Sequence, residues 1–156
     1  MKRLTIVPYK TLEKASFYTL EDVDKNGIAE TDEFIARFIN DLIYQRDLFE
    51  IATWLNKIGE EYGALERYFR PESSALALPI YKNKLRLYCI RISDELLILG
   101  NGGAKTSKKV QDSPDAYPSF RAIIALSKML AWRRRHGEVT ISNRLLHGNL
   151  TFEIEL

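Results

Sequence analysis

The stretch LRLYCIRISDELLILGNGGAKT, residues 85–106, decides the fold of this chain. Apolar residues dominate Leu85 to Ser93, and a second apolar run covers Glu95 to Gly100 after a short polar break. A third run, Ala75 to Tyr81, precedes them across another short polar segment. Connections this short are typical of hairpins, because antiparallel strands need only a few residues to reverse direction. The three runs therefore predict an antiparallel β-meander.

The middle strand of this meander is predicted to bury both of its faces. Side chains of a strand alternate between two faces, which gives one set of four on each side. One face carries Arg86, Tyr88, Ile90 and Ile92, and the other carries Leu85, Leu87, Cys89 and Arg91. Cys89 is the only cysteine, which excludes an internal disulfide and a zinc site of clustered cysteines. We expect it to be a core residue.

Helical spacing appears on both sides of the meander. Apolar residues recur every three or four positions from Thr31 to Ile43 and again from Asp47 to Tyr62, where Gly63 is a stop signal. Thr31 is predicted to be the N-cap of the first helix. Together these segments predict a helical hairpin. A third helix is predicted from Tyr117 to Arg135.

Short strands are predicted near the two ends of the chain, at Leu4 to Tyr9, Glu138 to Ser142 and Leu150 to Leu156. The residues from Lys10 to Gly27 are predicted to be rich in turns. The expected fold class is α+β: an N-terminal helical hairpin packed on a small antiparallel β-meander, with a further C-terminal helix and terminal strands. Residues 1–156 are expected to form one domain.

Composition excludes several classes of protein. The chain has 156 residues, of which 46% are hydrophobic and 28% are charged, and these values are typical of a globular domain. They exclude disordered, collagen-like and solenoid proteins. The longest apolar runs are far shorter than the ~20 residues that cross a bilayer, and the N-terminus lacks the pattern of a secretory signal. We expect a cytoplasmic protein without a membrane partner.

The charge is distributed unevenly, although the net formal charge is only +2. Residues 1–78 contain more acidic than basic side chains, whereas residues 79–156 contain 13 Lys and Arg against 7 Asp and Glu. A basic half favours an anionic partner such as RNA, although an ordinary solvated surface explains the same pattern. The candidate phosphate-binding residues are Lys82, Lys84, Arg86, Lys108, Lys109, Arg133, Arg134 and Arg135.

A calcium-loop pattern precedes the first predicted helix. Asp22, Asp24 and Asn26 are followed by Gly27 and, six residues later, by Glu33, as in the loop of an EF-hand. No second loop is present in the sequence, and an ordinary turn before a capped helix uses the same residue types. Calcium binding is therefore a weaker alternative.

A glycine-rich segment follows the last strand of the meander. Gly100 to Thr106 ends in Lys-Thr, as phosphate-binding loops do, but its spacing fails the GxxxxGK[ST] pattern. This failure argues against nucleotide hydrolysis. We expect the glycines to let the backbone leave the strand through positive φ angles, and the loop to place Lys105 where it can meet a phosphate.

The order of these elements resembles the RelE/HigB superfamily of type II toxin–antitoxin toxins, in particular its phage Gp49-like branch. The likeness rests on the strand Leu85 to Ile92, on Leu97-Ile98-Leu99-Gly100 and on Lys105-Thr106-Ser107-Lys108, and it covers about residues 45–130. The resemblance implies a toxin-like mRNA endoribonuclease, in some relatives acting on the ribosome, that a cognate antitoxin protein holds inactive. It implies no cofactor and no metal.

The resemblance also implies which residues act. Lys105, together with Arg86 or Arg91 and with Lys108 close by, is the candidate for gripping the scissile phosphate and stabilising the charged transition state. Tyr88 and His136 are added for their side-chain chemistry, as partners for general acid–base proton transfer. The candidate catalytic residues are therefore Arg91, Lys105, Tyr88 and His136.

Two alternatives stay open. Arg91, among apolar neighbours, must leave the apolar patch or be paired, and a salt bridge to Glu60 or Glu61 is the structural alternative to a functional role. On the level of the whole protein, the same fold serves as a non-enzymatic protein-binding module.

Overall fold

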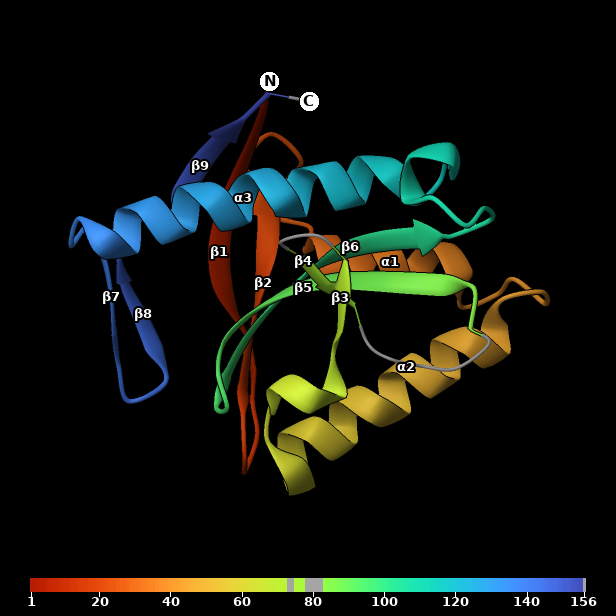
Figure 1. The fold of residues 1–156 in the computed structure, drawn as a ribbon, viewed down its shortest axis with the longest axis horizontal. Coiled ribbons are helices and arrows are strands. Elements are labelled where there is room, and N and C mark those ends of the chain that lie inside the picture. Colours follow the sequence, from red (N-terminus) through yellow and green to blue (C-terminus); the bar gives the residue numbers. More distant parts are fainter. Residues whose placement is uncertain (73–74, 78–82, 156) are drawn as a thin grey trace.

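The computed structural model describes residues 1–72, 75–77 and 83–155, and seven of its strands form one sheet (Figure 1). The order in the sheet is β3-β4-β5-β6-β2-β1-β9. The strands are β1 (Lys2–Thr11), β2 (Ser16–Asp22), β3 (Arg70–Glu72), β4 (Ala75–Ala77), β5 (Leu85–Ser93), β6 (Leu96–Ala104) and β9 (Thr151–Ile154). The predicted meander is confirmed as β4, β5 and β6, which pair antiparallel.

The sheet is mixed, and it is larger than the small antiparallel meander that the sequence predicts. β2 pairs parallel to β6, with Ser16 opposite Leu96 and Tyr18 opposite Ile98. β2 lies in a segment that we expected to be rich in turns, and that expectation is wrong. All but one of its residues are buried, because β2 lies between β1 and β6 in the interior of the sheet.

The N-terminal strand shows how proline is accommodated in a sheet. β1 pairs with β9 only over Lys2 to Thr5, so its later part has β2 as its one partner strand. Pro8 lies in this later part, next to an irregularity in the register between Pro8 and Lys10. This placement agrees with the rule that proline occurs at sheet edges and bulges, since it has no N–H for a second neighbour.

The three predicted helices are present as α1 (Glu30–Phe38), α2 (Gln45–Lys57) and α3 (Tyr117–Arg135). α2 continues into a π-helical turn, Ile58–Tyr62, and the chain leaves it at Gly63, whose φ is +79°. α3 has the predicted bounds, with a proline in its first turn, where the missing N–H costs nothing.

Two details of α1 differ from the prediction. The helix ends at Phe38 rather than near Ile43, because Leu42 and Ile43 belong to the exposed connection to α2. Thr31 is not the N-cap, a position that Ala29 occupies. The Thr31 hydroxyl is buried instead and donates to the Gly100 carbonyl oxygen at 2.9 Å. It therefore ties α1 to β6.

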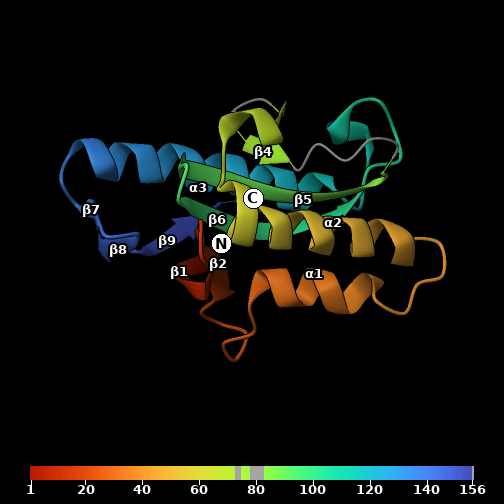
Figure 2. The ribbon, with the colours of Figure 1, turned by 90° about the horizontal axis from the view of Figure 1, so that it is seen from below.

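Helices cover both faces of the sheet, with α3 on one side and α1 and α2 on the other (Figure 2). The predicted faces of β5 are confirmed, since Tyr88 packs in the α3 core and Cys89 in the core beneath α1 and α2. β6 is buried in the same way, with Ile98 toward α3 and Leu97 toward α1. A strand buried on both faces reads as a nearly continuous apolar run, as residues 96–99 do.

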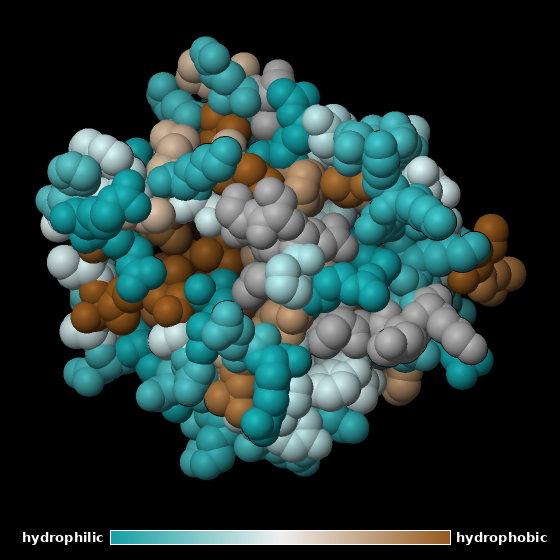
Figure 3. All heavy atoms as spheres, viewed as in Figure 1, coloured by the Kyte–Doolittle hydropathy of each residue, from teal (hydrophilic) through white to brown (hydrophobic). Residues whose placement is uncertain are grey.

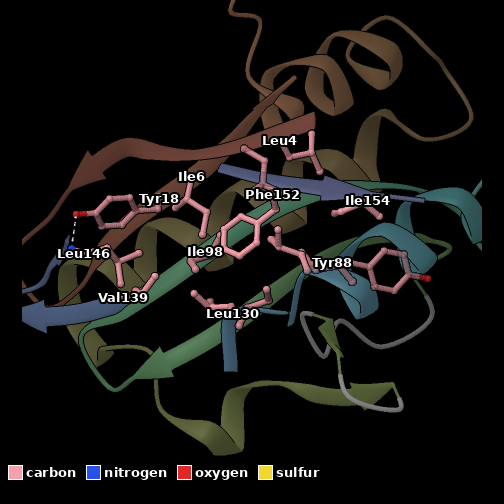
Figure 4. Close-up of a cluster of buried hydrophobic side chains, with 14 of the residues drawn as sticks. Leu4, Ile6, Tyr18, Tyr88, Ile98, Leu130, Val139, Leu146, Phe152 and Ile154 are labelled. Atoms are coloured by element: carbon pink, nitrogen blue, oxygen red, sulfur yellow. Dashed lines mark hydrogen bonds between the residues drawn. The ribbon is translucent and has the colours of Figure 1, made fainter. Parts of the chain in front are cut away.

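The core under α3 gathers strands from both ends of the chain (Figure 4). Leu4, Ile98 and Phe152 are fully buried there, and the hydroxyl of Tyr18 accepts a hydrogen bond from the Leu146 N–H at 3.0 Å. Leu146 belongs to a separate hairpin, β7 (Val139–Ser142) and β8 (Leu145–Gly148). The C-terminal strands are thus part of the main core.

The sequence prediction missed β8, which lies between the strands predicted at Glu138 to Ser142 and Leu150 to Leu156. The reason is the turn, which consists of only two residues, Asn143 and Arg144, at φ angles of 48° and 64°. Left-handed angles at both positions are typical of the tight turns that join β-hairpins, but Arg is an unusual residue there. The residue types around Arg144 therefore concealed the hairpin.

Candidate functional site

A basic groove lies where β3, β5 and the segment after β6 come together. We define the basic groove by the residues that line its main cavity of about 410 Å³: Arg70, Asn83, Lys84, Arg86, Lys105, Thr106, Ser107 and Lys108. A second hollow of about 560 Å³ shares three of these cationic residues and is also lined by Pro71, Val110, Gln111 and Phe120. The groove thus reaches the first turn of α3.

Electrostatics distinguishes this groove. Among the described residues, all of its ionisable lining side chains are cationic, namely Arg70, Lys84, Arg86, Lys105 and Lys108. Like charges in one concave site repel one another unless an anion joins them, and a concave surface concentrates the positive potential. The groove is therefore suited to a phosphate-bearing ligand.

Backbone hydrogen bonds fix the lip of the groove. The Lys105 N–H donates to the Lys84 carbonyl oxygen at 2.7 Å, which joins the two edges. The buried hydroxyl oxygen of Ser113 accepts from the N–H groups of Thr106 and Ser107 at 3.0 and 3.1 Å. These contacts hold the Lys-Thr-Ser-Lys segment in one conformation, so its side chains are presented from a rigid backbone.

The opposite wall is anchored to α2 through Asn83. Its side-chain oxygen accepts from the Leu85 N–H at 2.8 Å, and its amide nitrogen donates to the Asp47 carbonyl oxygen at 3.0 Å. The Asp47 carboxylate accepts from the Lys84 N–H at 2.8 Å. The guanidinium of Arg86 donates to the backbone carbonyls of Asn83 and Leu85. Arg86 is therefore held at the start of β5.

The glycines of residues 100–103 have a different role from the one predicted. They do not end the strand, since β6 continues to Ala104, and none of them has a left-handed φ. A Cβ on Gly102 would lie 1.8 Å from the Arg86 carbonyl oxygen, and one on Gly103 would lie 2.5 Å from the Asp115 carbonyl oxygen. Glycine is needed here because other backbone segments approach closely.

The structure separates the candidate catalytic residues. Lys105 lines the basic groove, but Arg91 lies on the opposite face of β5, five residues or about 16 Å along the strand from Arg86. Its Nε donates to the Ala64 carbonyl oxygen at 2.7 Å, and its guanidinium pairs with Asp94. Asp94, rather than Glu60 or Glu61, is therefore its ionic partner.

Tyr88 and His136 also lie outside the groove. Tyr88 is fully buried in the α3 core with its ring against that of Phe120, the ring centroids 5.5 Å apart. His136 follows the end of α3 and stacks on Trp132. It lies sixteen residues, or about 24 Å along the helix axis, from Phe120 at the groove. Neither residue lines the basic groove with Lys105.

The remaining cationic candidates differ in where the structure places them. Lys84, Arg86 and Lys108 line the groove, whereas the exposed Lys109 follows Lys108 without lining it. Arg134 and Arg135 are exposed near the end of α3. Arg133 points inward, as its guanidinium lies over the Phe152 ring at 3.9 Å. Lys82 lies outside the described residues.

Sequence reasoning missed Arg70, the cation that β3 contributes from the first half of the chain. The pairing of β3 with β4 and of β4 with β5 brings Arg70 to the groove. The local sequence around Arg70 therefore does not predict this position. It also missed Ser113, whose buried hydroxyl shapes the lip. A serine after Val-Gln-Asp carries no sequence signal for that role.

The calcium-loop residues form an ordinary turn between β2 and α1. The Asp22 carboxylate accepts from the Asp24 N–H at 3.0 Å, and Asn26 and Gly27 have left-handed φ angles. Glu33 lies 4.0 Å from the Lys25 ammonium. A strand, rather than a helix, enters this loop. In the part of the chain that the structure describes, no group of three His, Cys, Asp or Glu side chains could hold a metal ion.

A second cavity, of about 260 Å³, lies between α1, β6 and the start of α3. Its buried Glu30 carboxylate pairs with the Lys2 ammonium at 2.6 Å and accepts from the Asn101 amide at 2.7 Å. Arg37 pairs with Asp115 across the same cavity at 3.2 Å. These groups satisfy one another, so they connect the elements around the cavity.

Three comparisons with known proteins find nothing similar to this chain: no family model, no curated protein and no solved structure matches. Among the described residues, no helix is long and apolar enough to cross a membrane. Any functional conclusion must therefore come from the residues of the groove and of the surfaces next to it.

Proposed function

We propose that this protein binds RNA in the basic groove and cleaves it, as a toxin-like mRNA endoribonuclease that needs no metal. The observation that carries the proposal is the convergence of five cationic side chains, from separate strands, in one groove whose ionisable lining is entirely cationic. RNA carries one phosphate per nucleotide, and an open groove that tracks a backbone suits a polymer better than a free nucleotide.

The chemistry of cleavage fits this lining. The 2′-hydroxyl gives up its proton to water as its oxygen attacks the neighbouring phosphorus, the bond to the 5′-oxygen breaks, and water returns a proton to that oxygen. The products are a 2′,3′-cyclic phosphate and a 5′-hydroxyl. The intermediate state carries extra negative charge on the phosphate oxygens, and cations fixed in place stabilise it more than they stabilise the substrate. Lys105 is the proposed transition-state contact. Arg86, whose guanidinium donates to the Asn83 and Leu85 carbonyl oxygens, fixes the wall beside it, and Arg70, Lys84 and Lys108 position the strand.

The experiment compares inducible expression of the wild type with four variants, following bacterial growth and the integrity of a reporter mRNA. Lys105→Ala is expected to abolish mRNA cleavage, and Lys108→Ala is expected to weaken it. Lys109→Ala is the matched control, since it removes the same charge from the next residue, which does not line the groove. Arg91→Ala tests the other face of β5.

The proposal predicts arrest and cleavage with the wild type and Lys109→Ala, and neither with Lys105→Ala, at equal levels of folded protein. Intact mRNA with the folded wild type would refute the ribonuclease activity. Equal cleavage by Lys105→Ala and the wild type would refute the assignment to the groove, and loss of cleavage in a folded Arg91→Ala would move the site to the opposite face.

A second candidate function, a protein-binding module, is favoured by one surface. Leu42, Ile43 and Phe49 are 89%, 78% and 71% exposed, and the hydrophobic atoms at the right edge of Figure 3 lie where Figure 1 has the connection from α1 to α2. Exposed large apolar side chains that lie close together mark protein contacts. We propose this surface, on the α1 and α2 side of the sheet, for a cognate antitoxin protein.

The test of this surface is co-expression with a small helix-turn-helix protein encoded beside this chain. Formation of a complex that Leu42→Asp and Phe49→Asp abolish, while RNA binding is unchanged, supports the surface as the antitoxin contact. A complex that both variants keep would refute it. Binding of a partner by a protein that leaves RNA intact would favour the non-enzymatic module.

A further inference from the structure

The exposed side of α3 is the most basic helix surface among the described residues. α3 contains five Lys and Arg residues and no Asp or Glu over 19 residues. Arg121, Lys128 and Arg135 are exposed and are spaced by seven residues, which is close to two helical turns. They therefore lie in one row along the solvent side of the helix. We call this row the α3 stripe.

An exposed tryptophan lies within the α3 stripe. Trp132 follows Lys128 by four residues, which places it on the same face of the helix, and its side chain is 48% exposed. His136 stacks on it with ring centroids 3.9 Å apart and an angle of 17° between the planes. The His136 Nδ1 also lies 2.8 Å from the Trp132 carbonyl oxygen. Both rings are thus held in a defined orientation.

The indole borders a mostly apolar hollow of about 610 Å³. The lining residues are Lys128, Met129, Trp132, Arg133 and Glu138. The charged lining residues are two cations, Lys128 and Arg133, and one anion, Glu138, so the lining is net positive. A flat apolar surface beside an ammonium group suits a ligand that combines an aromatic ring with a nearby anion.

We propose that the α3 stripe continues the basic groove as a track for single-stranded RNA, on which Trp132 stacks a base while Arg121 and Lys128 contact phosphates. The inference rests on the proposed function, since it extends the same RNA from the groove. Unpaired bases stack on aromatic side chains regardless of their identity, whereas a duplex hides its bases. The track therefore selects single strands.

The geometry connects the two sites. Phe120, in the first turn of α3, lines the hollow that adjoins the groove, and Arg121 follows it directly. Phe120 and Trp132 are twelve residues apart, or about 18 Å along the helix axis. At about 3.4 Å per nucleotide this span corresponds to roughly five nucleotides, and an extended strand needs fewer. A strand of about twelve nucleotides therefore reaches both sites.

The test uses Trp54→Phe, which leaves Trp132 as the one tryptophan of the protein. Trp54 lies in α2, on the other side of the sheet, and packs against Tyr62 and Tyr68. The probe is a 2′-O-methyl oligouridine of about twelve nucleotides, which spans both sites but has no free 2′-hydroxyl to attack. Inorganic polyphosphate is the control anion without bases, and phosphatidylglycerol vesicles are the control surface.

The proposal predicts that the oligonucleotide quenches Trp132 fluorescence and that polyphosphate does not. Trp132→Ala is expected to weaken binding by about 5- to 150-fold, which corresponds to the loss of one stacked base, while Trp132→Phe keeps most of the affinity. Arg121→Ala and Lys128→Ala are each expected to lower the salt dependence by about 0.7 in the logarithmic slope. Double-stranded RNA is expected to bind more weakly than the single strand.

Other outcomes overturn the inference in distinguishable ways. One such outcome is tight, salt-dependent binding that does not quench Trp132 fluorescence and has the same affinity in Trp132→Ala. It would place the RNA in the groove alone and leave the proposed function intact. Quenching by vesicles but not by RNA would make the stripe a membrane contact. Absence of RNA binding by the folded protein would refute both the track and the proposed function.

Discussion

The three consecutive arginines at the end of α3, Arg133 to Arg135, allow a direct test of which of them stabilises the fold. Arg133 donates two hydrogen bonds from one nitrogen, to the carbonyl oxygens of Asn149 at 2.9 Å and Thr151 at 2.7 Å. Its guanidinium also covers the ring of Phe152, which is fully buried. Arg134 and Arg135 are exposed. Arg133 follows Leu130 by three residues and Leu126 by seven, so helical spacing places it on the buried side of α3, unlike its two neighbours.

The expected cost of Arg133→Ala follows from these contacts. A cation over an aromatic ring contributes about 1 kcal/mol, and hydrogen bonds from a charged donor contribute about 1.5–3 kcal/mol each when fully buried. Because the guanidinium and both hydrogen bonds are partly exposed, solvent weakens each contribution, and we expect a loss of about 2–3 kcal/mol, which is less than the sum for a buried group. For a domain of this length that lowers the Tm by roughly 4–12 °C.

Thermal unfolding followed by circular dichroism measures the effect, with Arg134→Ala and Arg135→Ala as matched controls. Each control removes the same side chain from the same helix and is expected to change stability by less than about 0.5 kcal/mol. Arg133→Lys keeps the charge but lacks the planar fork, so an intermediate loss is expected. Equal Tm values for the three alanine variants would refute the structural role of Arg133.

Three other predictions follow from buried groups. Gly102→Ala places a Cβ 1.8 Å from a carbonyl oxygen of β5. It is expected to lower the urea midpoint well below that of Gly137→Ala, whose Cβ meets no atom within 4 Å and which costs only the strain of a left-handed φ of +73°, about 1 kcal/mol. Equal midpoints would contradict this. Burial raises the pKa of the Cys89 thiol, so the folded protein should not react with a thiol reagent at neutral pH. Fast labelling of the folded protein would contradict this prediction. Partial burial, followed by the hydrogen bond to Asp32, raises the pKa of Tyr9 above its ordinary value of about 10. The free energy of unfolding of the wild type should therefore exceed that of Tyr9→Phe by its full amount below pH 10, and the difference should shrink above pH 10. A difference that grows with alkaline pH would refute the shift.

Much of the fold could be predicted because burial leaves a periodic trace in the sequence. The alternation around Tyr88 and Cys89 predicted both covered faces of β5, and the spacing of Ile123, Leu126 and Leu130 predicted α3. β2 escaped because it is short and carries polar residues, such as Thr19, whose buried hydroxyl bonds to that of Thr31. A partner from a distant segment cannot be read from a local pattern.

The candidate site was predicted less completely, because a groove is made by strand order rather than by sequence order. Lys84, Lys105 and Lys108 were identified from local charge, and they do converge. Arg70 required the pairing of β3 with β4, which depends on the whole sheet. Arg91 attracted attention as a cation among apolar residues, yet its partners, Ala64 and Asp94, give it a structural role.

The arginines differ in what the fold does with them, and this difference explains how a nearly neutral protein presents a basic surface. Arg91, Arg133 and Arg144 each donate to backbone carbonyl oxygens, and Arg144 joins Leu12, Glu13 and the Glu95 carboxylate in this way. A guanidinium used as a brace contributes little attraction for an external phosphate, because its donors are already directed inward. The exposed cations of the groove and of the α3 stripe lie on the α3 side of the sheet. Arg91, Arg133 and Arg144, which we call braces, instead join elements of the fold to one another. Removing a brace should therefore reduce stability, and removing an exposed cation should reduce RNA affinity; a variant set in which both properties changed together at every position would contradict this division.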